Sequence, residues 1–392
     1  MRRALVYFTS FNSTPGGSEY LPLLLVAELQ KSFEVTLALN WKSDVASAAH
    51  MLGIPVVADR LSVVVVKPKL RFLGKIDSFI PVFSTWRLKA LAKNADICFS
   101  AANMADFGKP AHHFVYLLRT FGDNAFMDYV RHLPPKVGFA RFKRTARTFL
   151  AEAILRPLLG VRSTRKILSD PREHIYPNSL YVESIMREFY GEFNSSVFYP
   201  PTLFSSESST AVARNPLRVV CVGQIFPEKR VTEIIAIVER AREISMRDLT
   251  LTIAGNLGNT AYVESVKTLA DHREWVTLAG GVYGDAKSRL LLSATYAIHA
   301  ERDETFGISV TEYLKAGLIP IVPDEGGTPE VVVSPALTYR TNEEAAQILA
   351  RLLSEADFRA TELAHCQNRA RFFFRESYAE RQHELIGEIT RL

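Results

Sequence analysis

Two carboxylates lie on either side of the predicted start of a helix. Gly307 permits a tight turn and the helix is expected to begin near Ile308, which leaves Glu304 in the preceding loop and Glu312 about one turn inside. The first turn of a helix carries backbone N–H groups that stabilise an anion such as a diphosphate. The two carboxylates can then hold the hydroxyls of a sugar and of a ribose. The alternative is a solvated helix whose acidic residues only complement the helix dipole. The N–H groups expected to meet the anion are those of Phe306, Gly307, Ile308 and Ser309.

A second loop supplies positive charge. The apolar run 217–222 predicts a strand, and Gln224, Lys229 and Arg230 follow it. Lysine offers a point charge and arginine a planar fork, and both suit a diphosphate. A lysine at the start of a helix is also common as a plain solvated charge, so this alternative stays open.

Strands and helices alternate in both halves of the chain. In the first half, a strand at 3–10, a helix at 19–31 and a strand at 33–39 form the opening unit of a parallel, doubly wound sheet. Ligands of such sheets bind at the carboxyl ends of the strands, where the loops described above converge. The sequence therefore predicts an α/β protein with two Rossmann-like domains that face each other across a cleft. In the second half the expected elements are strands at 217–222, 249–254, 275–278, 294–300 and 318–322 and a helix at 231–243.

Two glycine-rich turns accompany these units. Gly16 and Gly17 follow the first strand and let the backbone approach a bound group, although a plain turn between strand and helix is about as common. The full GxGxxG pattern is absent, which argues against a nicotinamide dinucleotide. The turn at 280–284 includes Val282, and its backbone can meet a flat base.

The remaining patterns predict further elements and the domain limits. We expect Ser179 to cap a helix at 180–189, and Thr328 to cap a helix with Pro329 at its first position. Additional strands are expected at 54–58, 61–66, 95–100 and 113–118, and helices begin near Asn342 and Ser377. The predicted division is a first Rossmann-like domain at 1–204, a polar linker at 205–216, a second Rossmann-like domain at 217–375, and a helix at 376–392 that crosses back to the first domain.

Composition indicates a globular protein of the cytosol. The 392 residues are 47% hydrophobic and 23% charged, and no apolar run approaches the roughly 18 residues of a membrane span. The charged amino terminus leads into a strand and not into a signal peptide. The three cysteines have no metal-ligand spacing, which suits a reducing compartment.

Segment 131–172 is rich in arginine and lysine and contains a stretch with one apolar and one basic face. This pattern suits contact with an anionic membrane at its inner face and a lipid-linked or lipopolysaccharide-type acceptor. The alternative is a solvated basic face that packs on the core. Nucleic acid is disfavoured because no nucleic-acid motif accompanies the charge.

Taken in order, these motifs resemble the retaining GT-B glycosyltransferases of family 4. The resemblance is carried by Gly223-Gln-Ile-Phe-Pro-Glu-Lys229, by Glu304-x-Phe-Gly-Ile with Glu312, and by Gly326-Gly327-x-x-Glu330. It extends to Gly16-Gly17-Ser-Glu19, Ile175-Tyr-Pro-Asn178-Ser179 and Tyr199-Pro200-Pro201, and so covers nearly the whole chain. Gln224 replaces the arginine usual in the family, and the loop that contains it is similar to that of the dolichol-linked α-1,2-mannosyltransferases that use GDP-mannose.

The resemblance implies a role for each motif residue. Glu304 would hold donor-sugar hydroxyls and act at the anomeric centre, Glu312 would hold the ribose, and Lys229 with Gln224 or Arg230 would neutralise the diphosphate. Gly17 would approach that diphosphate from the first domain. His113 is the nearest match to a family histidine that faces the donor sugar, with Tyr116 as the alternative for that position.

The implied chemistry is hexosyl transfer from a GDP- or UDP-linked sugar to a glycan or lipid-linked acceptor, with retention of configuration. No Asp-x-Asp, HExxH or Cys/His cluster points to a metal, and no cofactor is expected. Lys229 and a helix amino terminus can stabilise the leaving diphosphate instead. Two alternatives stay open, namely a small soluble acceptor for the same fold and a catalytically silent protein that binds a nucleotide or glycan.

Overall fold

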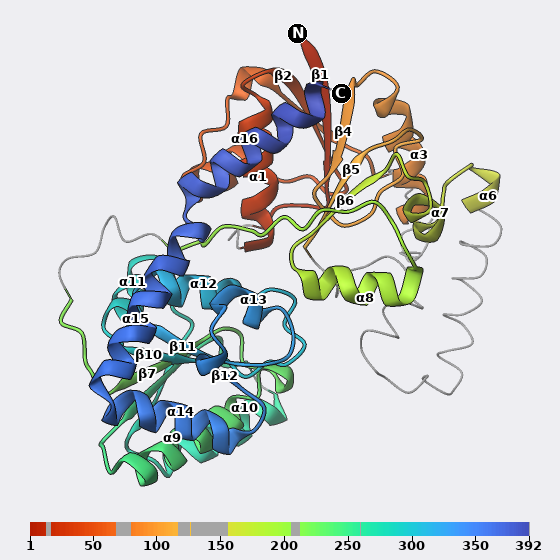
Figure 1. Cartoon of the computed structure of the whole chain (residues 1–392). Helices are drawn as coiled ribbons and strands as arrows, with labels where there is room; N and C mark the ends of the chain where they lie inside the picture. Colours follow the sequence, from red (N-terminus) through yellow and green to blue (C-terminus); the bar gives the residue numbers. More distant parts are fainter. Residues whose placement is uncertain are drawn as a thin grey trace. The chain divides into compact units, whose positions relative to one another are not determined.

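The chain divides into two compact units, one formed by Met1–Tyr199 with Ala379–Leu392 and the other by Pro200–Tyr378. A computed structural model describes residues 1–12, 17–67, 80–116, 126, 156–204, 212–258 and 260–391. The sequence analysis predicted that the first domain ends at residue 204 and that the second domain spans residues 217–375. Residues 205–211 of the expected linker lie outside the described residues. Figure 1 shows both units and the course of the chain.

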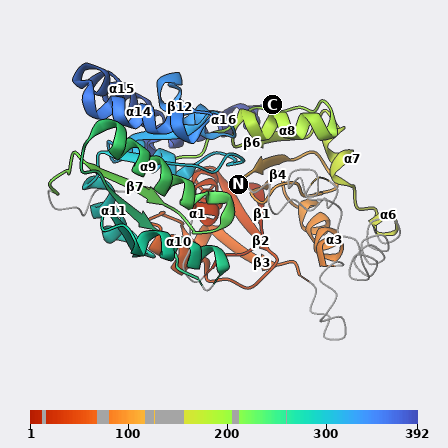
Figure 2. The same cartoon turned by 90° about the horizontal axis from the view of Figure 1, so that it is seen from below.

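The first unit is built on a parallel sheet of six strands in the order β3-β2-β1-β4-β5-β6. Figure 2 shows β1, β2 and β3 next to one another, in agreement with their registers. The strands are β1 (Arg2–Phe8), β2 (Phe33–Leu39), β3 (Leu61–Val65), β4 (Ile97–Ser100), β5 (His112–Val115) and β6 (His174–Pro177). The helices that belong to this unit are α1 (Gly17–Leu29), α2 (Val45–Met51), α3 (Ile80–Ala92), α6 (Arg156–Leu158), α7 (Thr164–Leu168) and α8 (Leu180–Tyr190).

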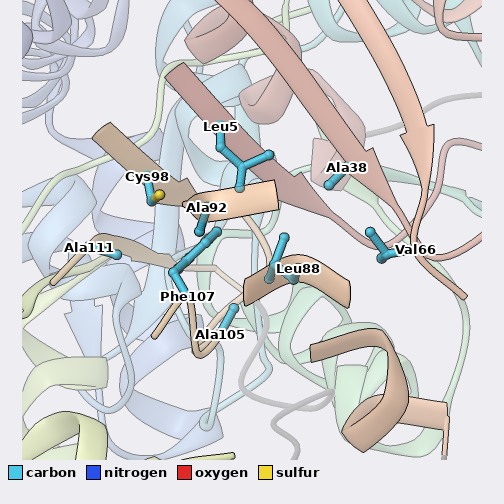
Figure 3. Close-up of a cluster of buried hydrophobic side chains, with 9 residues drawn as sticks. All are labelled: Leu5, Ala38, Val66, Leu88, Ala92, Cys98, Ala105, Phe107 and Ala111. Atoms are coloured by element: carbon cyan, nitrogen blue, oxygen red, sulfur yellow. The ribbon is translucent and has the colours of Figure 1, made fainter. Parts of the chain in front are cut away.

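Small and branched apolar side chains hold this sheet against α3. Leu5 of β1 and Cys98 of β4 are buried, and Leu88 and Ala92 of α3 belong to the same cluster, which Figure 3 shows. Burial of such side chains, at about 25 cal/mol per Å² of apolar surface, stabilises the layered arrangement. Ser179 caps α8 by accepting a hydrogen bond from the N–H of Val182, as the sequence predicts.

The second unit has a parallel sheet of six strands in the order β12-β11-β10-β7-β8-β9. Its strands are β7 (Arg218–Val222), β8 (Thr250–Ala254), β9 (Val276–Gly280), β10 (Tyr296–Ile298), β11 (Ile319–Pro323) and β12 (Thr338–Tyr339). Its helices are α9 (Val231–Ser245), α10 (Ala261–Asp271), α11 (Gly284–Leu292), α12 (Ile308–Lys315), α13 (Thr328–Val332), α14 (Asn342–Ser354) and α15 (Ala356–Ala370). The predicted α/β class is therefore confirmed, with two doubly wound sheets.

The carboxyl-terminal helix α16 (Arg375–Arg391) begins in the second unit and ends in the first. Within the first unit, His383 of α16 lies 2.8 Å from Glu28 of α1. Among the described residues no helix is both long enough and apolar enough to cross a bilayer.

Two predicted elements are wrong. Residues 54–57 are not a strand, because Pro55 lacks an N–H donor and the side chain of Gln30 occupies both backbone groups of Val57. Thr328 is not a helix cap, since Gly327 holds that position and Thr328 is the first helical residue of α13. Helices α2, α3, α7, α10, α11 and α15 and strand β12 were not predicted.

Candidate active site

The loop after β7 is placed by contacts that only glycine allows. A Cβ at Gly255 would lie 2.0 Å from the carbonyl oxygen of Gly223, so the backbones of β8 and of this loop touch. A single 3-10 turn at Pro227–Lys229 follows, and Arg230 adopts a left-handed conformation at the start of α9. These turns direct Lys229 back toward the end of β10, where its ammonium meets two carboxylates.

Lys229 is the centre of the site. Its Nζ lies 2.6 Å from Oε2 of Glu301 and 2.6 Å from Oε2 of Glu304. Burial by itself would raise the pKa of Glu304, but the charge of Lys229 and the hydrogen bonds to the carboxylate together outweigh it and lower the pKa to about 2. Burial likewise works against the charged form of Lys229, yet the two carboxylates raise its pKa above the ordinary value. Lys229 and Glu304 are therefore ionised near neutral pH.

His299 completes this cluster, and the sequence analysis missed it. The residue directly follows β10, is buried, and has its Nε2 3.6 Å from Oε2 of Glu304. Within the described part of the chain, Nε2 has no hydrogen-bond partner. Burial, with the nearby Lys229 charge, lowers the pKa of His299 to about 3, so the ring is neutral. The only signal in the sequence was its position at the end of a predicted strand.

Helix α12 begins directly after this cluster, as predicted. Gly307 precedes it with φ of 95°, a conformation that glycine adopts without strain, and accepts a hydrogen bond from the N–H of Val310 at 2.9 Å. Phe306 is buried and packs against Phe373 with ring centroids 5.8 Å apart, which anchors the turn. The first-turn N–H groups at Ile308 and Ser309 have no intrahelical acceptors and form the polar end of the helix.

A glycine pair supports the Glu304 loop from behind. The N–H of Gly327 donates to the carbonyl of Glu304 at 2.7 Å, and a Cβ at Gly327 would lie 2.4 Å from the carbonyl oxygen of Thr305. The methyl group of Thr328 lies against Gly307, 2.7 Å from the position of an added Cβ. The segment that begins α13 therefore fixes the backbone from which Glu304 projects.

Glu312 lies inside α12, is buried, and pairs with Lys287 of α11, whose Nζ is 2.6 Å from Oε1 of Glu312. Burial raises the pKa of Glu312, and Lys287 opposes that shift. The sequence analysis did not identify Lys287. Nearby on the chain, Tyr283 is exposed and donates to Asn256 at 3.1 Å, beside the partly buried Val282.

The structure brings some predicted residues together and separates others. Lys229 contacts Glu304, whereas the Nε of Arg230 is 2.5 Å from Glu233 and so engages a residue of its own helix. Gln224 is exposed in the loop between β7 and the 3-10 turn. Tyr313 of α12 contacts the end of β7, because the N–H of Val222 donates to the tyrosine hydroxyl at 2.8 Å.

The first unit contains His113, whose contacts favour a structural role. The ring is buried in β5, its Nε2 lies 2.9 Å from Glu173, and its Nδ1 accepts from the N–H of Ala105 at 3.5 Å. Glu173 in turn pairs with Arg162 at 2.7 Å. Both ring nitrogens thus have hydrogen-bond partners inside the first unit, and these contacts do not support the predicted catalytic role of His113. Tyr116 is half-buried after β5, and Gly17 is the first residue of α1.

One group of possible metal ligands occurs among the described residues: His299, Glu301 and Glu304, with their ligand atoms within 4.8 Å of one another. The ammonium of Lys229 already lies at hydrogen-bond distance from both carboxylates. A divalent ion would have to displace this ammonium or share its carboxylates. The residues present therefore fit a resident lysine cation better than a metal ion.

Known structures with similar folds are glycosyltransferases. The protein superposes on HepE of Anabaena, solved in complex with UDP and glucose, with a TM-score of 0.65 and 14% identity over 99% of this chain and 100% of that one. WaaG, a glycosyltransferase of lipopolysaccharide biosynthesis, gives a TM-score of 0.64 and 14% identity over 98% and 99% of the two chains. The fold is that of the GT-B glycosyltransferases.

Sequence comparison finds a family match and two curated relatives for part of the chain. Residues 206–371 match the family described as glycosyl transferases group 1. Over 164 residues the chain is 30% identical to the GDP-Man:Man(3)GlcNAc(2)-PP-Dol alpha-1,2-mannosyltransferase of Candida glabrata, and the match covers 38% of this chain and 32% of that protein. The protein of the same name from Caenorhabditis elegans is 28% identical over 167 residues, with 38% and 35% covered. The chain thus matches roughly a third of the length of these relatives.

We expect Gly327→Ala to disturb the site and Gly258→Ala to leave it intact. The added methyl at Gly327 meets the Thr305 carbonyl, and the Glu304 loop must shift, whereas no atom lies within 4 Å of a Cβ at Gly258. Unfolding in urea should show a loss of about 1–3 kcal/mol for Gly327→Ala and a change within about 0.5 kcal/mol for Gly258→Ala. Equal stability of the two variants would contradict the supporting role of Gly327.

We also expect the second unit to lose stability as the pH falls from 7 to 5. The pKa of His299 is depressed in the fold, so the unfolded chain binds a proton that the folded chain refuses. Stability is therefore lost between about pH 6.5 and the folded pKa, and amounts to about 2 kcal/mol at pH 5.

Urea unfolding at the two pH values, followed for wild type and His299→Gln, measures this contribution. His112 of the first unit, with its pKa lowered to about 3 mainly by burial, should keep its own pH dependence in the variant and serves as the internal control. An identical pH dependence of the second unit in both proteins would count against a buried neutral His299.

Proposed function

We propose that the protein is a retaining glycosyltransferase that moves a hexosyl group from a nucleotide-sugar to a glycan or glycolipid acceptor. The observation that carries this proposal is the Lys229 ammonium, held 2.6 Å from Glu304 at the start of α12. A sugar that bears a diphosphate needs a cation at the diphosphate and an acceptor for its hydroxyls. Lys229 supplies the cation and Glu304 supplies the hydrogen-bond acceptor, and the two side chains are hydrogen-bonded to each other.

The reaction breaks the bond between the anomeric carbon and a diphosphate oxygen, and forms a bond from that carbon to an acceptor oxygen on the same face. Negative charge grows on the departing diphosphate, and Lys229 with the N–H groups at Ile308 and Ser309 stabilises it. The ionised Glu304 holds donor hydroxyls and favours the positive charge of an oxocarbenium-like state. Glu312 holds the ribose, and the proton of the acceptor leaves with the diphosphate.

We propose that this transfer needs no metal. The support is the position of Lys229, which provides the positive charge at the carboxylates where a divalent ion would otherwise bind. Lysine as a phosphate ligand supplies a point charge without a coordination sphere.

GDP-mannose is our first candidate for the donor, and a UDP-sugar is the second. The names of the sequence relatives specify GDP-mannose and a dolichol-linked acceptor, and HepE was solved with UDP and glucose. A lipid-linked glycan is accordingly the acceptor class that we propose.

The test is a thermal-shift panel with GDP, UDP, GDP-mannose, UDP-glucose and UDP-GlcNAc, followed by transfer assays with the donor that binds. One base should raise the melting temperature, because a ligand of the folded state stabilises it. Lys229→Ala and Glu312→Ala should remove that shift, while Glu325→Gln, an exposed acid paired with Arg302, should retain it. Turnover should persist in EDTA.

A panel without any shift would refute the nucleotide-sugar site. A shift without transfer to any acceptor would identify a binding protein, and transfer only to small soluble acceptors would exclude the glycolipid. Loss of turnover in EDTA, restored by a divalent ion, would overturn metal independence alone.

We further propose a cytoplasmic enzyme in peripheral contact with an anionic membrane through basic segment 131–172. Residues 127–155 lie outside the described residues. In the described remainder, Arg162 pairs with Asp106, Arg165 lies over Phe189, and Arg172 pairs with Asp170. The part of the segment at 131–155 is therefore the one assigned to the lipid.

Sedimentation with phosphatidylglycerol vesicles at moderate salt tests this contact. Arg144→Gln should weaken binding about fivefold, since a basic residue near the lipid contributes about 1 kcal/mol, and Arg172→Gln is the matched control. Binding that is equally strong to neutral phosphatidylcholine vesicles, or absent from both, would refute the electrostatic contact.

A further inference from the structure

The cluster around Lys229 contains one more carboxylate than the proposed transfer requires. Glu304 has a task at the donor sugar, but Glu301 has none, although it is only 3% exposed and lies as close to the ammonium as Glu304 does. Two carboxylates therefore share one ammonium. A site for a diphosphate would gain affinity without Glu301.

A buried carboxylate loses its hydration, and this cost is met only by a close, well-oriented partner. For Glu301 that partner is Lys229, which comes from the loop after β7, whereas Glu301 itself follows β10. The pair therefore joins two separate loops at the carboxyl edge of the sheet. It also sets the position of the ammonium before any ligand arrives.

A lysine ammonium has three N–H donors. Two of them are directed to Glu301 and Glu304, so one remains for a phosphate oxygen. Glu301 lies 2.6 Å from this ammonium, so its negative charge opposes that of a diphosphate bound at the remaining donor. The opposition is strongest when the charge on the ligand is greatest, which is after the sugar has left.

We infer that Glu301 is a positioning residue that holds Lys229 in place and limits its affinity for the released nucleoside diphosphate, so that this product can leave. The inference rests on the proposed function, since it assigns Lys229 to the diphosphate. Glu301 touches neither the donor sugar nor the reacting atoms and acts through the lysine.

Glu301→Gln tests the inference, because glutamine keeps an oxygen that accepts from Lys229 and nearly the same volume but removes the charge. Calorimetry with GDP and UDP on the full chain should show about tenfold tighter binding of the product diphosphate than in wild type. The single-turnover rate should stay close to wild type, while the steady-state kcat falls because product release becomes slower.

Two variants serve as controls. Glu325→Gln changes the net charge equally but at an exposed pair with Arg302, and should leave the affinity for the diphosphate unchanged. Glu301→Asp keeps the charge but shortens the reach, and should bind the product as wild type does while its single-turnover rate drops. If Glu301→Gln does not fold, Glu301→Ser supplies the second neutral variant, with the same expected tightening.

Unchanged or weaker binding of the diphosphate by the folded neutral variants would overturn the inference. The proposed function fails in a different way: wild type would then bind neither GDP nor UDP, or Lys229→Ala would bind as well as wild type. A protein that loses binding in Lys229→Ala, but does not gain it in Glu301→Gln, keeps the proposed function and refutes only the role of Glu301.

Discussion

The site of the second unit depends on one half-buried ammonium held between two carboxylates, of which Glu301 is buried and Glu304 is half-buried. Lys229 with Glu301 and Glu304 satisfies three groups that burial alone would drive toward their neutral forms. Removal of Lys229 leaves two carboxylates without their cation, which is among the costliest single changes that a fold can suffer. The same charges are the ones that a diphosphate and a sugar would engage. Stability and the proposed chemistry are therefore coupled in this cluster.

Close backbone contacts make this arrangement possible. Gly255 allows β8 to touch the loop of Gly223, and Gly327 allows the start of α13 to touch the loop of Glu304. In both places a side chain would push apart the segments that hold Lys229 and Glu304. A rigid frame of parallel strands with loops that meet at one edge fits a site that must present charges before its ligand arrives.

The first unit contains a second buried ionic network that has another purpose. Arg162 bridges Asp106 and Glu173, and Glu173 holds the ring of His113. The arginine also draws the chain after α6 onto the sheet of this unit. These contacts of His113 favour a role in orienting the polypeptide.

The sequence by itself determined the alternation of strands and helices, the start of α12 at Ile308, and the positions of Lys229 and Glu304 on loops at strand ends. It also determined that Glu312 lies about one turn inside α12. These features depend on local periodicity, on glycine conformation and on the order of motifs along the chain. The cap of α8 at Ser179 was local as well, and it was predicted correctly.

Only the tertiary structure decided which groups meet. Glu301 and His299 looked like loop and strand residues, because their importance comes from Lys229, about seventy positions away. Likewise, two hydrogen bonds between the side chain of Gln30 and the backbone of Val57 replace the strand expected at 54–58. The side chain of Glu173 is hydrogen-bonded to His113, which is sixty positions away in the sequence. Electrostatic pairing and burial act between residues that are distant in sequence, so neither the composition nor the spacing of motifs could reveal these contacts.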